Sequence, residues 1–359
     1  MPSVGAIKMP EMRSRERVRL ALTGQLPDRI PVSLGFFSQS LPGIPDADEH
    51  FNLDVRYAEW SPPAGQDDFL RYLRRLPPDV HVGTAAQLRI YHEWDYHPEV
   101  AGGRLSGVSS VAELAEAYFP DLTSPQRYAG LAGQVQRWHE EGLAVAGSPP
   151  HLGGELFESA YRMRGFEQFL LDLVERPALA NYLLDQLTAV TIHNALVLAQ
   201  AGVDILLLDD DVAMPTGLIL SPATWREYFQ PRLRSIIQLA REAAPDLLVF
   251  YHSDGNFTRL LPDLVEIGVN VINPVQPDCM DAAAIKAEFG DRLALWGTVG
   301  TASAWDFGAP DQIRAEVRQR IEQLGPAGLL LAPAYDIDFT PLENIHAFVE
   351  AVHEFGASV

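Results

Sequence analysis

Residues 246–268 read DLLVFYHSDGNFTRLLPDLVEIG. The stretch begins with an apolar run of strand-forming residues, continues with a short polar turn, and ends with an amphipathic helical pattern. A strand that is buried on both faces reads as such a continuous apolar run, which is typical of parallel sheets. The stretch therefore predicts one β-strand followed by one α-helix, with the strand over residues 246–252.

The same strand–helix unit recurs through the second half of the chain. Five strands are expected there, at residues 203–209, 246–252, 269–274, 292–297 and 328–333. Each is followed by a polar or Pro/Gly-containing turn and then by a helical pattern. Three weaker strand candidates stand in the first half, at residues 29–36, 79–83 and 142–148.

Eight strand–helix units predict an α/β fold of the (β/α)8 TIM-barrel type. An open dinucleotide-binding sheet fits less well, because no G-x-G-x-x-G turn follows any strand. The connections at residues 37–78 and 84–141 are too long for simple loops, so we expect them to carry helical insertions in the first half. We interpret residues 1–12 as a loose tail and residues 13–359 as a single barrel domain.

The composition limits which partners and which cellular compartment we expect. The 27 Lys and Arg residues stand against 48 Asp and Glu residues in 359, which gives a formal net charge of −21. This charge repels phosphate backbones and anionic headgroups, so we expect neither nucleic acid nor a membrane as a partner. A single cysteine, Cys279, excludes an internal disulfide framework. No apolar stretch reaches the ~18 residues that span a bilayer, and we expect a soluble cytoplasmic protein.

Polar side chains follow several of the predicted strands. In a barrel of this type the active site lies where the strands end. The residues at these ends are Asp209, Asp210, Asp211, His252, Asp254, Asn256, Asn273, Gln276, Tyr335, Asp336 and Asp338. Loops are polar in most proteins, so a plain polar rim explains part of this set. Its concentration at one face nevertheless predicts the site.

Each of these residues has a functional and a structural interpretation. His252 fits a metal ligand or a general acid/base, or else a tautomer-locked residue that bonds a neighbouring loop. Asp254 fits a second ligand beside it, or ordinary turn chemistry. Adjacent strand residues point to opposite sides, so only one or two of Asp209, Asp210 and Asp211 can face one cavity. There they would bind a cation or raise one another's pKa, and elsewhere they would serve the helix entry.

Several segments together resemble the uroporphyrinogen decarboxylase superfamily, which includes the methylcobamide:coenzyme M methyltransferases. The segments are RERVRLALTGQLPDRIPV (15–32), LLLDDDVAMPTGLILSP (206–222), HSDGN (252–256), NPVQP (273–277), FGDRLALWG (289–297) and LAPAYDIDFTPLENI (331–345). The first of them looks like the methyltransferase side of the superfamily. The resemblance covers about residues 13 to 356 and implies the (β/α)8 fold.

The departures from the family pattern bear on function. The decarboxylases carry an arginine-rich loop after the first strand to hold a porphyrinogen with many carboxylates, whereas this chain reads GFFSQSLPG (35–43) there. Authentic uroporphyrinogen decarboxylation is therefore disfavoured, since unpaired buried carboxylates are costly. Arginines from elsewhere could restore such a pocket. The candidates are Arg89, Arg162 and Arg164. Tyr161 matches the position of the family's active-site tyrosine.

The zinc methyltransferases of the family bind their metal through His-x-Cys after the fifth strand and a second cysteine after the eighth. This chain keeps His252 but has Asp254 and Tyr335 at the cysteine positions. Cys279 could supply a thiolate, but a lone loop cysteine is more often incidental. What remains is an oxygen-rich pair, His252 and Asp254, that could hold zinc or another divalent metal if an acid from 209–211 or Glu155 joined it.

The leading hypothesis is a corrinoid-linked methyltransferase or demethylase component that moves a methyl group between a small substrate and cobalamin on a separate protein. Its catalytic residues would be His252, Asp254, Tyr161 and Asp210. Its substrate-binding residues would be Asp209, Asp211, Asn273, Gln276 and Tyr335. The alternatives are a decarboxylase of a tetrapyrrole or smaller carboxylic acid, and a non-catalytic tetrapyrrole- or corrinoid-binding protein. The family also implies a homodimer.

Overall fold

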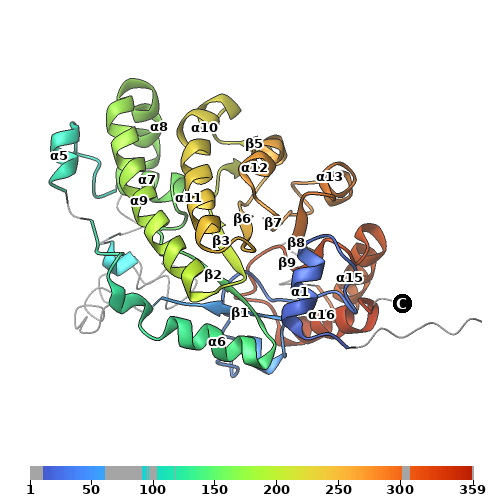
Figure 1. Ribbon diagram of the computed structural model, residues 1–359. Coiled ribbons are helices and arrows are strands. Elements are labelled where there is room, and N and C mark those ends of the chain that lie inside the picture. Colours follow the sequence, from blue (N-terminus) through green and yellow to red (C-terminus); the bar gives the residue numbers. More distant parts are fainter. Residues whose placement is uncertain are drawn as a thin grey trace, which may run out of the picture.

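Seven parallel strands form the main sheet of the molecule (Figure 1). The computed structural model describes residues 11–60, 91–94, 96, 103–117, 119–300 and 308–357. In sheet order the strands are β1 (Val55–Ala58), β2 (Ala144–Gly147), β3 (Ile205–Asp209), β6 (Leu248–His252), β7 (Val271–Asn273), β8 (Ala294–Val299) and β9 (Leu329–Pro333). A separate antiparallel hairpin, β4 (Ala213–Met214) with β5 (Gly217–Leu218), follows β3.

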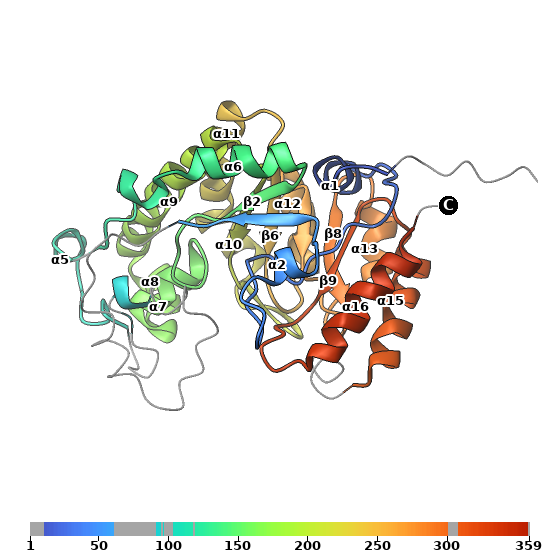
Figure 2. The same cartoon turned by 90° about the horizontal axis from the view of Figure 1, so that it is seen from below.

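Helices cover the outer face of the sheet. Figure 2 shows α6, α9 and α11 on one side of the strands and α15 and α16 on the opposite side. The helices are α1 (Ser14–Leu22), α2 (Ala47–His50), α5 (Val111–Ala115), α6 (Leu131–Glu141), α7 (Phe157–Arg164), α8 (Phe166–Glu175), α9 (Pro177–Ala201), α10 (Pro222–Tyr228), α11 (Gln230–Ala243), α12 (Leu261–Ile267), α13 (Ala282–Phe289), α15 (Pro310–Leu324) and α16 (Leu342–Phe355), with the 3₁₀ turns η1 (Pro125–Tyr128) and η2 (Thr258–Leu260). In the described part of the chain no helix is long and apolar enough to cross a membrane.

The segment around Val32 closes the sheet into a barrel. Val32 forms a parallel bridge with Leu331 in β9, and Ser33 N donates to Leu331 O (3.1 Å). On the other side, Asp54 N donates to Val32 O (3.2 Å) just before β1. The segment thus fills the eighth position between β9 and β1, which confirms the (β/α)8 fold and the barrel position predicted for residues 29–36.

The second position of the barrel differs from the sequence prediction. It is occupied by β1, which lies in the stretch 37–78 that we expected to be a connection with extra helices. The expected strand at 79–83 lies outside the described residues. The strand β1 escaped the sequence pattern because it has only four residues and Arg56 interrupts its apolar run. The assignment of residues 13–359 to one domain stays a prediction.

Alternate residues of each strand fill the barrel interior. Leu207, Phe250 and Trp296 belong to this inner layer, whereas their strand neighbours pack outward against the helices. Val18 and Leu22 of α1 join the same inner cluster next to the first residues of the strands. The barrel is therefore solid, and α1 covers its N-terminal end.

The N-terminal end of the barrel is held by arginine–aspartate pairs. Asp54, which is fully buried, accepts from Arg17 Nη1 (2.8 Å), from both Nη atoms of Arg29 (2.7 and 2.9 Å) and from Val32 N (2.9 Å). Arg17 also binds Asp28 in a bidentate pair (2.7 and 2.8 Å). These contacts tie the helix of the 15–32 motif to the segment that closes the barrel.

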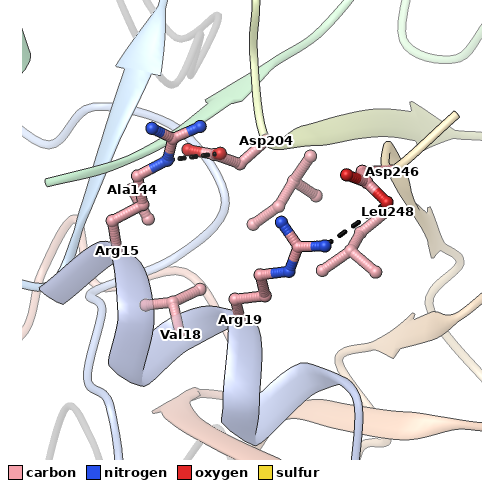
Figure 3. Close-up of a pocket in the computed structure, with 8 residues that line it drawn as sticks. Arg15, Val18, Arg19, Ala144, Asp204, Asp246 and Leu248 are labelled. Atoms are coloured by element: carbon pink, nitrogen blue, oxygen red, sulfur yellow. Dashed lines mark hydrogen bonds and ion pairs between the residues drawn. The ribbon is translucent and has the colours of Figure 1, made fainter. Parts of the chain in front are cut away.

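A small cavity lies at the same end, between α1 and the beginnings of β2, β3 and β6. Figure 3 shows Arg15 and Arg19 reaching from α1 towards Asp204 (2.8 Å) and Asp246 (3.4 Å) across it. The volume of about 20 Å³ is enough for roughly one water molecule. Because catalytic residues of such barrels lie at the other end of the strands, we interpret this cavity as a packing gap under a structural helix.

Candidate functional site

Three neighbouring strands present polar side chains to the C-terminal end of the barrel, here called the mouth. Asp209 pairs in register with His252, and His252 with Asn273. All three continue the inward-facing rows of their strands, since Leu207, Phe250 and Val271 stand two residues before them in the inner layer. The alternation of side chains therefore brings Asp209, His252 and Asn273 together above the packed interior.

Hydrogen bonds fix the orientation and tautomer of His252. Asn273 Nδ2 donates to Trp296 O (2.9 Å), which leaves Asn273 Oδ1 as the acceptor opposite His252 Nδ1 (2.5 Å). His252 Nδ1 therefore carries a proton, and in the neutral imidazole Nε2 keeps a free lone pair. The ring of Phe36 stacks on the imidazole with 4.4 Å between centroids. Both contacts direct Nε2 in one fixed direction.

Three carboxylates surround the Nε2 atom of His252. The nearest oxygens of Asp211, Asp254 and Asp209 lie 3.6, 3.8 and 3.9 Å away. Asp211 Oδ1 also accepts from Asp254 N (2.6 Å), and Asp254 Oδ1 accepts from Gln276 Nε2 (2.9 Å). Asp209 is 9% exposed, and its buried Oδ1 atom has no hydrogen-bond partner among the described residues.

Burial and neighbouring charges raise the pKa of Asp209 and of Asp254. Burial raises the pKa of Asp209 well above its ordinary value, and the charge of Asp211 raises it further. Burial also raises the pKa of Asp254 to about 6, although the charge of His252 opposes this shift. In the described part of the chain no arginine or lysine forms an ion pair with Asp209, Asp211 or Asp254. The mouth is thus a concentrated negative site with one imidazole at its centre.

The turn after β6 is shaped by a close approach to the hairpin. Gly255 has φ +78°, and a Cβ atom there would lie 2.7 Å from the backbone of Met214. Asn256 N donates to Met214 O (2.9 Å), while Asn256 Oδ1 accepts from Thr258 N (3.2 Å). The glycine and asparagine of HSDGN therefore build the turn, and the histidine and aspartate of the same motif face the site.

Asp210 and Glu155 bind backbone N–H groups. Both carboxylate oxygens of Asp210 accept from the start of α7, from Phe157 N (2.8 Å) and Glu158 N (2.9 Å). Glu155 Oε2 accepts from Asp209 N (2.6 Å), and its buried Oε1 atom has no partner in the ranges that the structure describes. The geometry favours a capping role for Asp210, so its predicted catalytic role has no contact in its support.

A cluster on α7 includes the predicted tyrosine. One oxygen of Glu158 accepts from both Tyr161 Oη (2.7 Å) and Arg162 Nη2 (2.9 Å). Arg162 Nη1 donates to Tyr91 Oη (2.8 Å), and its guanidinium lies 5.8–6.0 Å from the ring centroids of Tyr91, Tyr96 and Tyr161. Tyr161 therefore donates its hydroxyl hydrogen to Glu158, so its oxygen can only accept a hydrogen bond from a further partner.

Two of the three arginines that could bind a polycarboxylate are already paired with acids, and the third lies outside the described residues. Arg162 is neutralised by Glu158. Arg164 is fully buried in a pair with Asp172 (2.7 Å) and also donates to backbone carbonyls. Arg89 lies outside the described residues. The described mouth therefore offers no unpaired guanidinium from this set.

Two other predicted positions lie beside the carboxylates without joining them. Tyr335, at the family's second cysteine position, donates to Asp278 Oδ2 (3.0 Å). Gln276 bridges the HSDGN turn, since its Oε1 accepts from Gly255 N (2.9 Å) and its Nε2 donates to Asp254. Cys279 Sγ lies 3.5 Å from Gln276 Oε1. Gln276, in the loop after β7, therefore supports the HSDGN turn, and the thiol of Cys279 is hydrogen-bonded to Gln276.

The sequence pattern missed His151, Glu158 and Phe36. Burial lowers the pKa of His151 to about 4, while the charge of Glu158 raises it and the charges of Arg162 and His252 lower it. His151 therefore lies within electrostatic range of the mouth. It follows β2, whose weak apolar run gave little reason to examine the next loop. Glu158 stands inside a helix, where a carboxylate carries no signal of its own.

The residues of the mouth fit a divalent cation. Single ligand atoms of Asp209, Asp211 and His252 lie within 4.8 Å of one another. The imidazole offers its lone pair, its other nitrogen is bonded to an amide oxygen as metal-bound histidines usually are, and Asp209 Oδ1 lacks any other partner. Asp254 adds a third carboxylate at 3.8 Å from Nε2.

The sequence matches a family model and known proteins over slightly more than half of its length. Residues 143–355, more than half of the chain, match the family model described as uroporphyrinogen decarboxylase (URO-D). Over 193 residues the chain is 31% identical to the methylcobamide:CoM methyltransferase MtaA of Methanosarcina barkeri, with 53% of each protein covered. It is 28% identical over 192 residues to a uroporphyrinogen decarboxylase of Pelodictyon phaeoclathratiforme, with 52% of each covered. The chain thus spans about half the length of these relatives.

The fold also matches a solved structure over nearly its whole length. A methyltransferase from Methanosarcina mazei superimposes with a TM-score of 0.65 at 21% identity, covering 96% of this chain and 99% of that one. This likeness concerns the fold and agrees with the eight-position barrel derived from the hydrogen bonds.

Proposed function

Because the chain belongs to the uroporphyrinogen decarboxylase (URO-D) family, we propose that it moves a methyl group between a small substrate and a cobalamin carried by a separate corrinoid protein. The observation that carries this proposal is the fixed Nε2 lone pair of His252 among three carboxylates at the barrel mouth. The names of the Methanosarcina relatives support the methyl-transfer chemistry. Homodimer formation and a cytoplasmic location stay predictions.

The chain's own residues would bind a metal and orient the substrate. Zinc or another divalent ion, when bound, supplies Lewis-acid activation of the atom that gives or takes the methyl group. His252 offers Nε2 to the ion, and Asn273 holds the ring in place. Asp254 and Asp209 offer carboxylate oxygens. Phe36 covers one face of the imidazole and shields it from water.

The cluster on α7 would position the substrate. Tyr161 is held by Glu158, so its oxygen can accept a hydrogen bond from a substrate hydroxyl or amine. Donation from Tyr161 to a substrate would require that its hydrogen bond to Glu158 first break. Burial raises the pKa of Tyr161, and the negative charge of Glu158 raises it further. The phenol therefore stays protonated near neutral pH.

A polycarboxylate decarboxylase is the less supported alternative. A substrate with many carboxylates needs unpaired arginines, whereas Arg162 and Arg164 are already paired with Glu158 and Asp172. The negative charge of Asp209, Asp211 and Asp254 would also repel such a substrate. A smaller, singly charged acid meets the same repulsion to a lesser degree.

The test is formation or loss of the cobalt–carbon bond. The purified protein is incubated with cob(I)alamin and with methoxylated, N-methylated or S-methylated donors, and methylcobalamin is followed by its absorbance. We expect one donor class to react, and His252→Ala to lower the rate by roughly 100-fold. Asp291→Asn, which removes an exposed carboxylate away from the mouth, should leave the rate unchanged.

Two outcomes would contradict the proposal. One is the absence of methylcobalamin with every donor class, with free cobalamin and with a cobalamin-loaded corrinoid protein alike. The other is tight corrinoid binding that is unchanged in His252→Ala and Asp254→Ala, with no turnover in any form. The second outcome would favour a non-catalytic binding protein.

A further inference from the structure

The acids around His252 lie at the ends of two strands, β3 and β6, and their oxygen atoms determine which cation the site suits. We propose that the mouth holds a hard, oxygen-seeking divalent ion of the Mn²⁺ type through Asp209, Asp211 and His252, with Asp254 as a further oxygen ligand, in place of a thiolate-bound zinc. The inference shares its location with the proposed methyl transfer but concerns binding alone. It assigns ligand roles to two aspartates of the β3 end, where the family pattern has none.

The first argument is the geometry of the ligand atoms. The oxygens of Asp211, Asp254 and Asp209 lie 3.6–3.9 Å from His252 Nε2. Ligands bound to one ion at about 2.1–2.2 Å stand roughly 3 Å apart when they are adjacent in an octahedron. The ligand atoms of Asp209, Asp211 and His252 lie within 4.8 Å of one another, so they need to approach one another by up to about 2 Å to meet this spacing. Only small side-chain rotations are therefore required.

The second argument is independent of the acidic cluster. Asp209 is 9% exposed, yet its Oδ1 atom has no hydrogen-bond partner in the described part of the chain. A buried carboxylate oxygen is normally paired with a donor or a cation. The same residue lies 3.9 Å from the free Nε2 lone pair. The missing partner and the free lone pair thus face the same point.

The third argument is the chemical character of the set. Three carboxyl groups and one imidazole form an oxygen-rich set, and such sets suit Mg²⁺, Ca²⁺ and Mn²⁺, whereas thiolates select zinc. Among these three ions Mn²⁺ accepts the imidazole best. Cys279 Sγ is bonded to Gln276 and is absent from the converging ligand atoms. Tyr335, at the family's second thiolate position, is occupied with Asp278.

Direct binding measurements test the proposal without any methyl transfer. Protein stripped with a chelator is titrated with Mn²⁺, and the free ion is followed by electron paramagnetic resonance. We expect one site per chain, weakened at least roughly tenfold in His252→Ala and in Asp209→Asn. Asp291→Asn and Cys279→Ser should bind as the wild type does. Asp211→Asn removes a more exposed ligand and keeps the test valid if Asp209→Asn fails to fold.

Co²⁺ reports the ligand type. An octahedral oxygen–nitrogen site gives weak visible bands, and a thiolate site gives intense charge-transfer bands. Weak bands in the wild type support the proposal. Intense bands that disappear in Cys279→Ser overturn it, as does the absence of Mn²⁺ binding or a Mn²⁺ affinity that His252→Ala and Asp211→Asn leave unchanged. A protein that binds Mn²⁺ but transfers no methyl group refutes the proposed function and leaves this inference intact.

Discussion

The two ends of the barrel treat their acidic residues in opposite ways. At the N-terminal end Asp54 is fully buried and is bonded to both Arg17 and Arg29. At the mouth Asp209 is nearly as buried, but in the described part of the chain no arginine or lysine pairs with it, and the imidazole of His252 lies 3.9 Å away. Both aspartates belong to the same barrel, so the difference lies in their local partners. The difference teaches that burial alone does not identify a functional acid, since Asp54 is matched by two arginines whereas Asp209 faces the imidazole of His252.

The largest expected effect is the loss of a paired acid. Asp54→Ala leaves the buried Arg17 with Asp28 as its remaining carboxylate partner and removes the acceptor of Arg29 and Val32 N, which belong to the segment that closes the barrel. We expect a loss of about 3–5 kcal/mol in the free energy of unfolding, measured by urea denaturation. Arg19→Ala removes an exposed pair at the same end and should cost only about 0–0.5 kcal/mol. Equal effects of the two changes would refute this comparison.

The next effect concerns the orientation of His252. Asn273→Ala removes the acceptor opposite Nδ1 and lets the imidazole change tautomer or rotate. We expect Mn²⁺ affinity to fall by roughly 10–100-fold, with the urea midpoint little changed in comparison. Asn273→Asp keeps an acceptor oxygen at this position and should retain more of the affinity than the alanine variant. An alanine variant with wild-type affinity would show that the hydrogen bond does not position the ring.

Asp48 of α2 provides a third case, a buried acid outside both groups. Burial raises the pKa of Asp48 to about 7, and the charge of Arg56 lowers it only in part. In the unfolded chain the same group titrates near 4, so between about pH 4 and pH 7 the folded state holds a proton that the unfolded state releases. Stability should therefore fall as the pH rises through this window and level off above it.

The measurement for Asp48 is urea unfolding of the chelator-treated protein at several values between pH 4 and pH 8. Asp48→Asn should reduce this pH dependence, because asparagine carries no titrating proton, while the buried carboxyls of the mouth keep their own contribution. Arg56 stays in both proteins, so any remaining slope belongs to other groups. An unchanged slope in the variant would remove Asp48 from the explanation.

The smallest expected effect has the opposite sign to the first. Asp211→Asn removes one of three mutually repelling charges at the mouth, so the metal-free protein should gain about 0.5–1 kcal/mol in stability while its Mn²⁺ affinity falls. Thermal unfolding with and without Mn²⁺ measures both effects. If Asp211→Asn destabilises the metal-free protein, the contacts of the Asp211 carboxylate stabilise the fold by more than the repulsion among the three acids destabilises it.

Much of the fold and part of the site follow from the sequence. The apolar runs of β3 and β6 are long, and the period of two along them places Asp209 and His252 on the same inner face. The strand β1 could not be predicted, because four residues containing Arg56 have no periodic signal. The contact between Glu158 and Tyr161 was also out of reach, since it depends on where α7 begins, and Asp210 sets that position from a distant strand.

The bridge between Val32 and Leu331 of β9 closes the strands into a ring. Arg29 pairs with Ala357, and Ile30 N donates to Gly356 O (2.9 Å), so the segment that closes the barrel runs beside the residues that follow α16. Joining them by a short linker and opening the chain in a loop at the N-terminal end would give a circular permutant with the same cyclic order of strands. His252, Asp209 and Asn273 lie on three consecutive strands far from that join. The site belongs to the ring and is independent of where the ring is cut.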